Sequence, residues 1–270
     1  MKHTLLSLAV VIPMVALAQP QFNRSDLFSP GTSYQKFSIP ADSVLTETTG
    51  ADVVWNCSAS SSEEQNETIE PFSTQGPYQS FTGAGWVIGN QMGGDSLYRY
   101  FTSSDTSYGL NGFYHFSFDG FPPPPGSNGP MVYTPALDIL RFPAAMGSTF
   151  TQAISGQKNQ DPDTIMRYGT QTVTVDGYGT LTTPAGTFQD VLRVYTFQEM
   201  NDITMGGMYV RGFNVESWTW ISAATKGVPL LHKEITYDRD AFGMQSVAWY
   251  TDPGDVGMEN TYLRSFALYP

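Results

Sequence analysis

Carboxylates are the most numerous residues of this sequence that could do chemistry. The chain holds 25 Asp and Glu residues among 270, and a glycoside hydrolase needs two of them facing each other across a cleft. Each of them is otherwise interpreted as an ordinary solvated surface charge. Four lie on or near long alternating segments and are therefore the candidates for catalysis: Glu199, Asp202, Glu216 and Glu234.

Histidine is scarce, and this limits the catalytic chemistry. Of three histidines, His3 belongs to an apolar leader, and only His115 and His232 remain. A three-histidine zinc site and a histidine-based triad are therefore not expected. Both remaining histidines lie in predicted strands, where we expect hydrogen-bonded structural roles. No Gly-x-Ser-x-Gly elbow, His-Glu-x-x-His helix or phosphate loop is present. A non-enzymatic role is favoured, and an enzyme remains the alternative.

Two acidic pairs could offer oxygen ligands to calcium. They are Asp161-x-Asp163 and Asp252-x-x-Asp255, and neither matches a twelve-residue calcium loop. A polar turn is the favoured interpretation of both pairs. We therefore predict no metal site and no cofactor, with calcium as the alternative.

Aromatic side chains supply a second kind of candidate. They make up 14% of the chain, and flat rings in a row can bind the apolar faces of sugars. Burial in a β core is the competing explanation, because aromatic rings dominate such cores. The candidates for ligand binding are Tyr98, Tyr100, Tyr108, Tyr114, Trp218 and Trp220.

The elements that would carry these residues are strands. Short segments alternate with period two between Gly, Pro and Asp turns, and none shows a sustained helical stripe. Turns are expected at Asp176-Gly177 and Pro184-Ala185-Gly186, and a polar loop at 58–67. The prediction is an all-β fold, either an antiparallel β-sandwich or a barrel or half-barrel. The expected strands are 51–57, 85–88, 97–102, 108–118, 167–175, 178–182, 188–198, 208–222, 230–238 and 244–251.

The ends of the chain indicate export. Residues 1–18 combine a basic start, a short apolar run and an Ala-Leu-Ala site, which is typical of a signal peptide. Residues 19–255 form the β-rich domain, with a possible soft boundary in the proline-rich stretch 121–130. Residues 256–270 are a C-terminal linker. The expected location is the periplasm, the extracellular space or the cell surface.

Charge and cysteine content limit the partners. The net charge is −12, which opposes binding to nucleic acid, and no later apolar run is long enough to insert into a membrane. Cys57 is the single cysteine. We expect it to be a small buried hydrophobic residue, and a reactive thiol is the alternative.

Three segments resemble exported proteins of Bacteroidetes. Residues 176–194 (DGYGTLTTPAGTFQDVLRV) are similar to a hairpin common in them, and 50–56 (GADVVWN) to a segment near their start. Residues 256–260 and 265–270 resemble the linker and first residues of a type IX secretion sorting domain. The resemblance implies an N-terminal β region of type IX cargo. The sorting domain itself would be missing, so either the gene product is truncated or the protein is released differently.

Three functions follow from these observations. The first is a non-catalytic exported module that binds a carbohydrate or a surface. The second is a carboxylate-dependent glycan hydrolase, which would require two acids roughly 5 to 10 Å apart in an aromatic-lined cleft. The third is a barrel that holds an apolar ligand in an internal cavity.

Overall fold

A computed structural model shows the chain as a nearly all-β protein. It describes residues 19–61, 63–71, 81, 84–92, 95–116, 129–159, 164–204, 206–240 and 243–254. Helical structure in these residues is limited to the short 3-10 turns η1 (Arg24–Asp26), η2 (Ala41–Ser43) and η4 (Ala223–Thr225). The strands are β1 (Gln21–Phe22), β2 (Ser33–Ile39), β3 (Gly50–Asn56), β4 (Glu63–Pro71), β5 (Trp86–Met92), β6 (Asp95–Ser103), β7 (Ser107–Phe116), β8 (Gly129–Arg141), β9 (Ala144–Ala145), β10 (Thr149–Asn159), β11 (Thr164–Thr183), β12 (Gly186–Thr204), β13 (Tyr209–Ile221), β14 (Leu231–Asp238) and β15 (Met244–Asp252).

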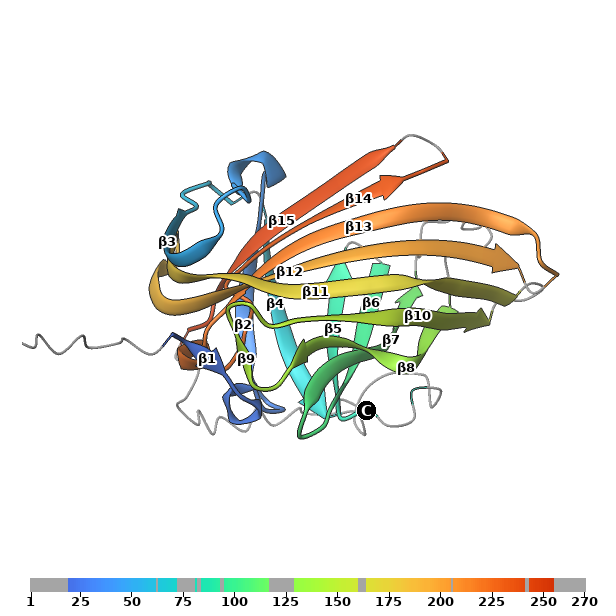
Figure 1. Cartoon of the computed structure of the whole chain (residues 1–270), viewed down its shortest axis with the longest axis horizontal. Coiled ribbons are helices and arrows are strands. Elements are labelled where there is room, and N and C mark those ends of the chain that lie inside the picture. The colour runs from blue at the N-terminus through green and yellow to red at the C-terminus, as the bar shows by residue number, and fades with distance from the viewer. Residues whose placement is uncertain are drawn as a thin grey trace, which may run out of the picture.

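Twelve of these strands form one closed antiparallel barrel (Figure 1). The order around the ring is β10, β8, β7, β6, β5, β4, β2, β15, β14, β13, β12 and β11. The pairing of β10 with β11 closes the ring. β3 is an additional strand, which pairs in parallel with the far end of β11. The predicted all-β fold is confirmed, and the barrel is the alternative that the chain adopts.

The two sides of the barrel wall differ in what covers them. Residues directly opposite in an antiparallel pair share a face, so the register assigns each side chain to the inside or the outside. Outside, β3 and the segment around η2 cover the wall, with Trp55 packed edge-on against Trp220 at 6.0 Å. Inside, Leu192 and Val194 belong to an apolar cluster, as their alternation predicted.

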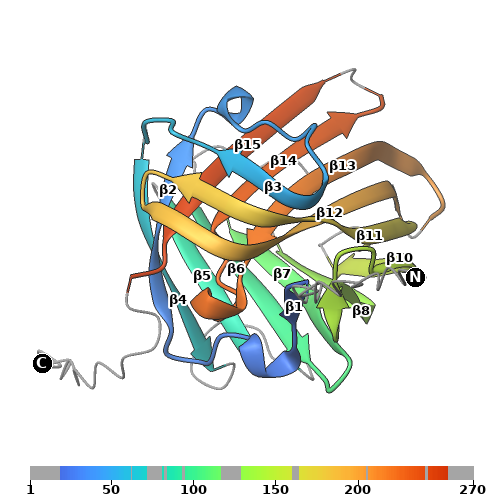
Figure 2. The ribbon, with the colours of Figure 1, turned by 60° about the vertical axis from the view of Figure 1, so that its left-hand side comes forward.

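Residues near the N-terminus of the described chain fill one end of the barrel. Phe22 packs with Ile221 and Val194, and Phe28 with Tyr108 and residues of β4 to β6. Beside them lies η4, and Gly227 follows it with a φ of +70°. Gly227 approaches the Phe22 ring so closely that a Cβ on this residue would lie 2.5 Å from the ring. Figure 2 shows this end, together with the opposite walls formed by β4–β7 and β11–β15.

Two local expectations were wrong. The turn expected at Asp176-Gly177 is a bulge inside the 20-residue strand β11, because Arg193 holds the Asp176 carboxylate and β3 pairs with the chain from Gly177 onward. The polar loop expected at 58–67 is partly β4, which begins at Glu63. Its alternate residues face the inside, and this gives a polar sequence a buried side.

Other expectations are met or lie outside the described residues. Cys57 is buried, as expected. The strands on either side of the proline-rich stretch, β7 and β8, pair with each other in the same barrel. Most of that stretch, 121–128, lies outside the described residues. Among the described helical segments, none has the length and apolar character needed to span a bilayer.

Candidate functional site

Four polar residues meet on the inner wall of the barrel. Tyr34 and Lys36 lie two residues apart on β2 and therefore share its inner face. The register places Glu67 of β4 directly opposite Tyr34. The Glu67 carboxylate accepts a hydrogen bond from the Tyr34 hydroxyl at 2.7 Å and another from Lys36 Nζ at 3.1 Å. Arg99 of β6 lies 3.6 Å from the same carboxylate. We call Tyr34, Lys36, Glu67 and Arg99 the Glu67 cluster.

An aromatic and two titratable side chains extend the Glu67 cluster across β14 and β15. Trp249 lies 4.6 Å from Lys36 Nζ and stacks on the His232 ring at 4.9 Å. His232 Nδ1 shares a hydrogen bond of 2.9 Å with the Thr219 hydroxyl, so this histidine has the structural partner that the sequence predicted. Glu234 follows on the same face, 3.9 Å from His232 Nε2. These three residues and the Glu67 cluster form what we call the lumen site.

Burial and the two cations determine the charges of this site. Burial by itself would raise the pKa of Glu67, but Arg99 and Lys36 outweigh it and hold that pKa below the usual value. Burial lowers the pKa of Lys36, although Glu67 opposes the change. Burial, with Lys36 and Arg99, lowers the pKa of His232 to about 3, so this histidine is neutral near pH 7. Burial raises the pKa of Glu234, against the influence of Arg99.

The lumen site borders accessible space. In a closed barrel, an inward side chain that keeps solvent exposure must face space inside the barrel or at its mouth. The side chain of Glu234 is 41% exposed, that of Arg99 30% and that of His232 17%, whereas Glu67 is only 2% exposed. The Glu67 carboxylate is therefore enclosed by its partners, and Arg99 and Glu234 are available to a molecule in this space.

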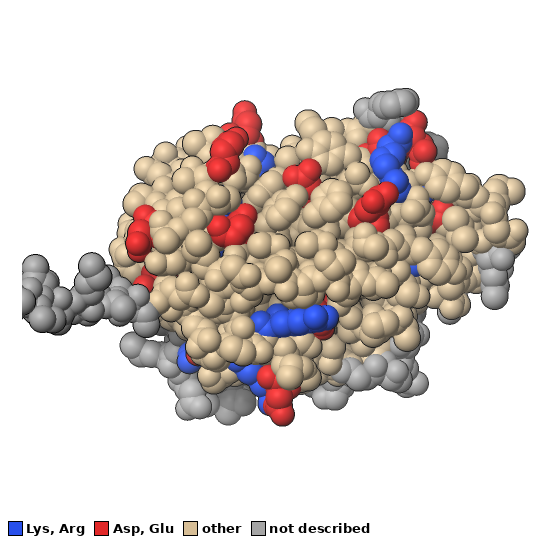
Figure 3. All heavy atoms as spheres, in the orientation of Figure 1, with Lys and Arg blue, Asp and Glu red and all other residues tan. Residues whose placement is uncertain are grey.

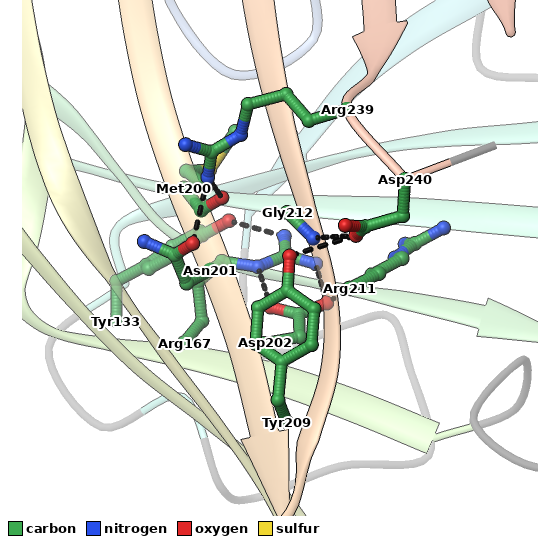
Figure 4. A network of polar contacts seen from close by, with 10 residues as sticks. All are labelled: Tyr133, Arg167, Met200, Asn201, Asp202, Tyr209, Arg211, Gly212, Arg239 and Asp240. Carbon is green, nitrogen blue, oxygen red and sulfur yellow. Dashed lines mark hydrogen bonds and ion pairs between the residues drawn. The ribbon is translucent and has the colours of Figure 1, made fainter. Parts of the chain in front are cut away.

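A second carboxylate lies on the inner wall where β11, β12 and β13 run side by side (Figure 4). Asp202 receives two hydrogen bonds from Arg167, at 2.7 and 2.9 Å, and a longer one from Arg211 at 3.5 Å. Arg167 also donates to the Tyr133 hydroxyl and lies over the Phe213 ring. Arg167 and Asp202 are both buried, so this bidentate pair is enclosed on all sides.

The outer face of the same region is clamped by the turn after β14. Arg239 donates to the Met200 carbonyl at 2.8 Å and to Asn201 Oδ1 at 2.6 Å. Asp240 accepts from the Gly212 amide and from the Tyr209 hydroxyl. Figure 4 shows that these contacts and the Asp202 pair surround the same stretch of β12 and β13. They fix the hairpin ends.

The four candidate catalytic acids are not brought together. Glu199 and Glu216 lie on the outer face, where Glu199 pairs with Arg239 and Glu216 bonds to the Tyr195 hydroxyl. Asp202 and Glu234 lie inside. On β13, Arg211 lies opposite Asp202 and Ser217 lies opposite Glu234, and these two residues are six positions apart. That spacing corresponds to about 20 Å along a strand, which is too far for a shared glycosidic bond.

The six candidate aromatics are distributed over three apolar clusters. Tyr100 and Tyr114 are buried on the outer face with Phe81, which stacks on Tyr100 at 3.8 Å, and Tyr98 packs against them. Tyr108 is buried inside the barrel. Trp218 and Trp220 are buried beneath β3. The structure therefore does not form a row of exposed rings from these residues.

The sequence analysis missed most of the lumen site. Glu234 and His232 were singled out from the sequence, whereas the other five residues were not: Tyr34, Lys36, Glu67, Arg99 and Trp249. A signal was present at Arg99, which lies between Tyr98 and Tyr100 in an aromatic segment, because a charge that becomes buried requires a partner. Among the described residues no group of acids, histidines or cysteines could hold a metal ion; Asp161, Asp163 and Asp255 lie outside them.

Glu67 and Asp202 share one property, since each is in contact with two cations. This arrangement suits the binding of a charged group better than proton transfer, because Glu67 and Asp202 are both occupied. Comparison with family models, with curated proteins and with solved structures found no match for this chain.

Proposed function

We propose that this chain is an exported, non-catalytic binding protein that holds a small amphipathic molecule inside its barrel. The observation that carries the proposal is the exposure of Arg99 and Glu234 on the inner wall, where Phe113 lies directly opposite Arg99 and packs against a buried apolar cluster. A ligand site of this kind is mostly apolar, with a few polar groups that fix orientation.

The size of the barrel supports this function. Side chains just fill barrels of about eight strands, or leave room for one small ligand, and this ring has twelve strands. One end is filled by Phe22, Phe28 and their neighbours. The lumen site lies on β2, β4, β6, β14 and β15, where polar residues still have accessible surface.

The inner acids favour binding over hydrolysis. Glu67 and Glu234 have pKa values shifted in opposite directions, which is a pattern found in acid–base pairs. However, Oε1 of Glu67 contacts Lys36 and Arg99, and Oε2 accepts from Tyr34. Because both oxygens are engaged and the side chain is enclosed, Glu67 has no free face for a nucleophilic or basic role.

Export and the relation to type IX cargo complete the proposal. The leader pattern of residues 1–18 and the three similar segments support an envelope or extracellular location. Outside the cell, a barrel with an internal site would carry or sequester a molecule with low solubility in water.

The test is a binding and hydrolysis panel on the purified chain. We expect saturable binding of one amphipathic probe per chain, displaced by unlabelled probe, and no release of nitrophenol from nitrophenyl glycosides. Oligosaccharide binding without amphiphile binding would favour the carbohydrate module. Glycoside turnover that is lost in Glu234→Gln and kept in Glu216→Gln would overturn the non-catalytic assignment.

A further inference from the structure

We propose that the ligand carries a carboxylate head group, which Arg99 binds. The hydrocarbon chain of the ligand then lies along Phe113 and Val215. This inference rests on the proposed function, because it names the chemical class of the molecule inside the barrel. Three properties support it: the excess of cations over carboxylates in the Glu67 cluster, the incomplete pairing of Arg99, and the apolar wall next to Arg99.

The charge around Glu67 is opposite in sign to that of the whole chain. The protein carries −12, and acidic side chains are spread over the face shown in Figure 3. In the Glu67 cluster, by contrast, one carboxylate is shared by two cations, Lys36 and Arg99. An excess positive charge in a partly enclosed site is costly unless an anion joins it. A carboxylate from the ligand would supply that anion.

Arg99 is the cation that remains available. Lys36 Nζ bonds to Glu67 at 3.1 Å, while the Arg99 guanidinium stays 3.6 Å away, beyond a good hydrogen bond. Among the described residues, no other ion pair or hydrogen bond of Arg99 is found, and its side chain is 30% exposed. A guanidinium offers five donors in a planar fork that matches a carboxylate. Arg99 can therefore bind a ligand anion without leaving Glu67.

The other titratable groups that face the site are His232 and Glu234. His232 is neutral at pH 7, because its pKa is lowered to about 3 by burial and by Lys36 and Arg99. Glu234 is the second acid that faces this space, and burial raises its pKa. The raised pKa favours the neutral carboxyl form, which repels a ligand carboxylate less than the ionised form does and can donate a hydrogen bond to it.

The apolar part of the ligand has a continuous wall beside Arg99. In the register of β6 and β7, Arg99 lies directly opposite Phe113. Phe113 and Val215 pack against the buried cluster of Tyr133, Met200 and their neighbours, and both remain partly exposed. This cluster joins β7 and β8 to β13 across the barrel. A hydrocarbon chain that starts at Arg99 would therefore lie against apolar side chains.

The experiment compares three probes with one chain length and different heads: dodecanoate, its methyl ester and dodecylamine. Isothermal titration calorimetry is carried out on the full chain, on Arg99→Gln and on the control Arg141→Gln, which removes an exposed cation that pairs with Asp138. We expect the chain to bind dodecanoate about tenfold or more tightly than the ester, and the amine most weakly.

The variants separate the head group from the barrel. Arg99→Gln should lower the affinity for dodecanoate about tenfold and leave the ester within about twofold, whereas Arg141→Gln should change neither. Equal affinity of the unaltered chain for dodecanoate and ester would overturn the head-group assignment but leave the proposed function standing. Failure of all three probes to bind would overturn both. If circular dichroism shows that Arg99→Gln is unfolded, the head-group assignment is tested with Arg99→Lys and with the ratio of dodecanoate affinity to ester affinity in the unaltered chain.

Discussion

The barrel contains two inner carboxylates with the same kind of partners and different surroundings. Asp202 and Glu67 each contact two cations. A tyrosine hydroxyl belongs to each network: that of Tyr34 donates to Glu67, and that of Tyr133 accepts from Arg167. Around Asp202, Arg167 is bidentate and buried, and the exposed Arg211 adds a longer bond of 3.5 Å to a carboxylate that Arg167 already pairs at both oxygens. Around Glu67 one cation is held at 3.6 Å and faces accessible space. The first arrangement stabilises the wall, and the second keeps a cation available for a ligand.

The largest effect is expected from Asp202→Asn. This change leaves the buried Arg167 without its carboxylate, and breaking a buried ion pair typically costs about 3–5 kcal/mol. The free energy of unfolding, measured in urea, should fall by that amount. The control Arg211→Gln removes the exposed partner and should cost less than about 1 kcal/mol. A loss below about 1 kcal/mol in Asp202→Asn would show that the pair is not a stabilising element.

Glu67→Gln should destabilise the chain less than Asp202→Asn does. We expect about 1–3 kcal/mol. Arg99 can move toward accessible space when the carboxylate is lost, and the buried Lys36, whose pKa is already lowered, can lose its proton, which Arg167 cannot do. The same change should tighten dodecanoate binding, since it removes a negative charge next to Arg99. Glu64→Gln is the matched control on β4, where Glu64 is exposed and accepts from Gln35. Equal losses for Glu67→Gln and Asp202→Asn would remove the contrast between the two clusters.

Acid should reveal the neutral histidine of the lumen site. The pKa of His232 is lowered from 6.5 to about 3 in the folded chain, so the unfolded chain binds the proton first as pH falls. Stability from this residue is present above pH 6.5 and is lost toward pH 3. The loss should reach about 1.4 kcal/mol by pH 5.5. In His232→Gln, the unfolding free energy measured between about pH 7 and pH 5.5 should fall less steeply as the pH is lowered. An unchanged pH dependence would contradict the assignment.

The smallest effect concerns ligand affinity and Glu234. Burial raises the pKa of this carboxyl group, so a rise in pH through that value ionises it and opposes a bound carboxylate. The affinity for dodecanoate should then fall about threefold or more, and Glu234→Gln should abolish the dependence. Glu216→Gln, on the outer face of the adjacent strand, should retain it. Affinity that rises with pH would reverse the proposed role of Glu234.

Local sequence predicted the strands better than their continuity. The alternation around Val173 and Val175 correctly predicted a strand, and Leu192 and Val194 are in the core as expected. Asp176-Gly177 has turn chemistry, but Arg193 pairs with Asp176 and a bulge forms instead. Contacts from a distant segment thus overrode a local preference.

The candidate site was predictable only in fragments. Glu234 and His232 were singled out by type, whereas the Glu67 cluster joins residues from three strands that are separated along the chain. Alternation shows that Lys36 and Trp249 belong to one face of their own strands. Alternation does not show which strands are neighbours. β2, for example, lies between β4 and β15, and β15 is at the other end of the sequence.

The sequence by itself determined an all-β chain with few histidines, one cysteine and a strongly acidic balance, because these follow from composition and from period-two alternation. The tertiary structure decided that the sheet closes through β10 and β11, and that two cations meet at Glu67. The physical reason is that a strand specifies its two faces locally. Its neighbours, and the side of the sheet that becomes the inside, follow only from the pairing of all twelve strands.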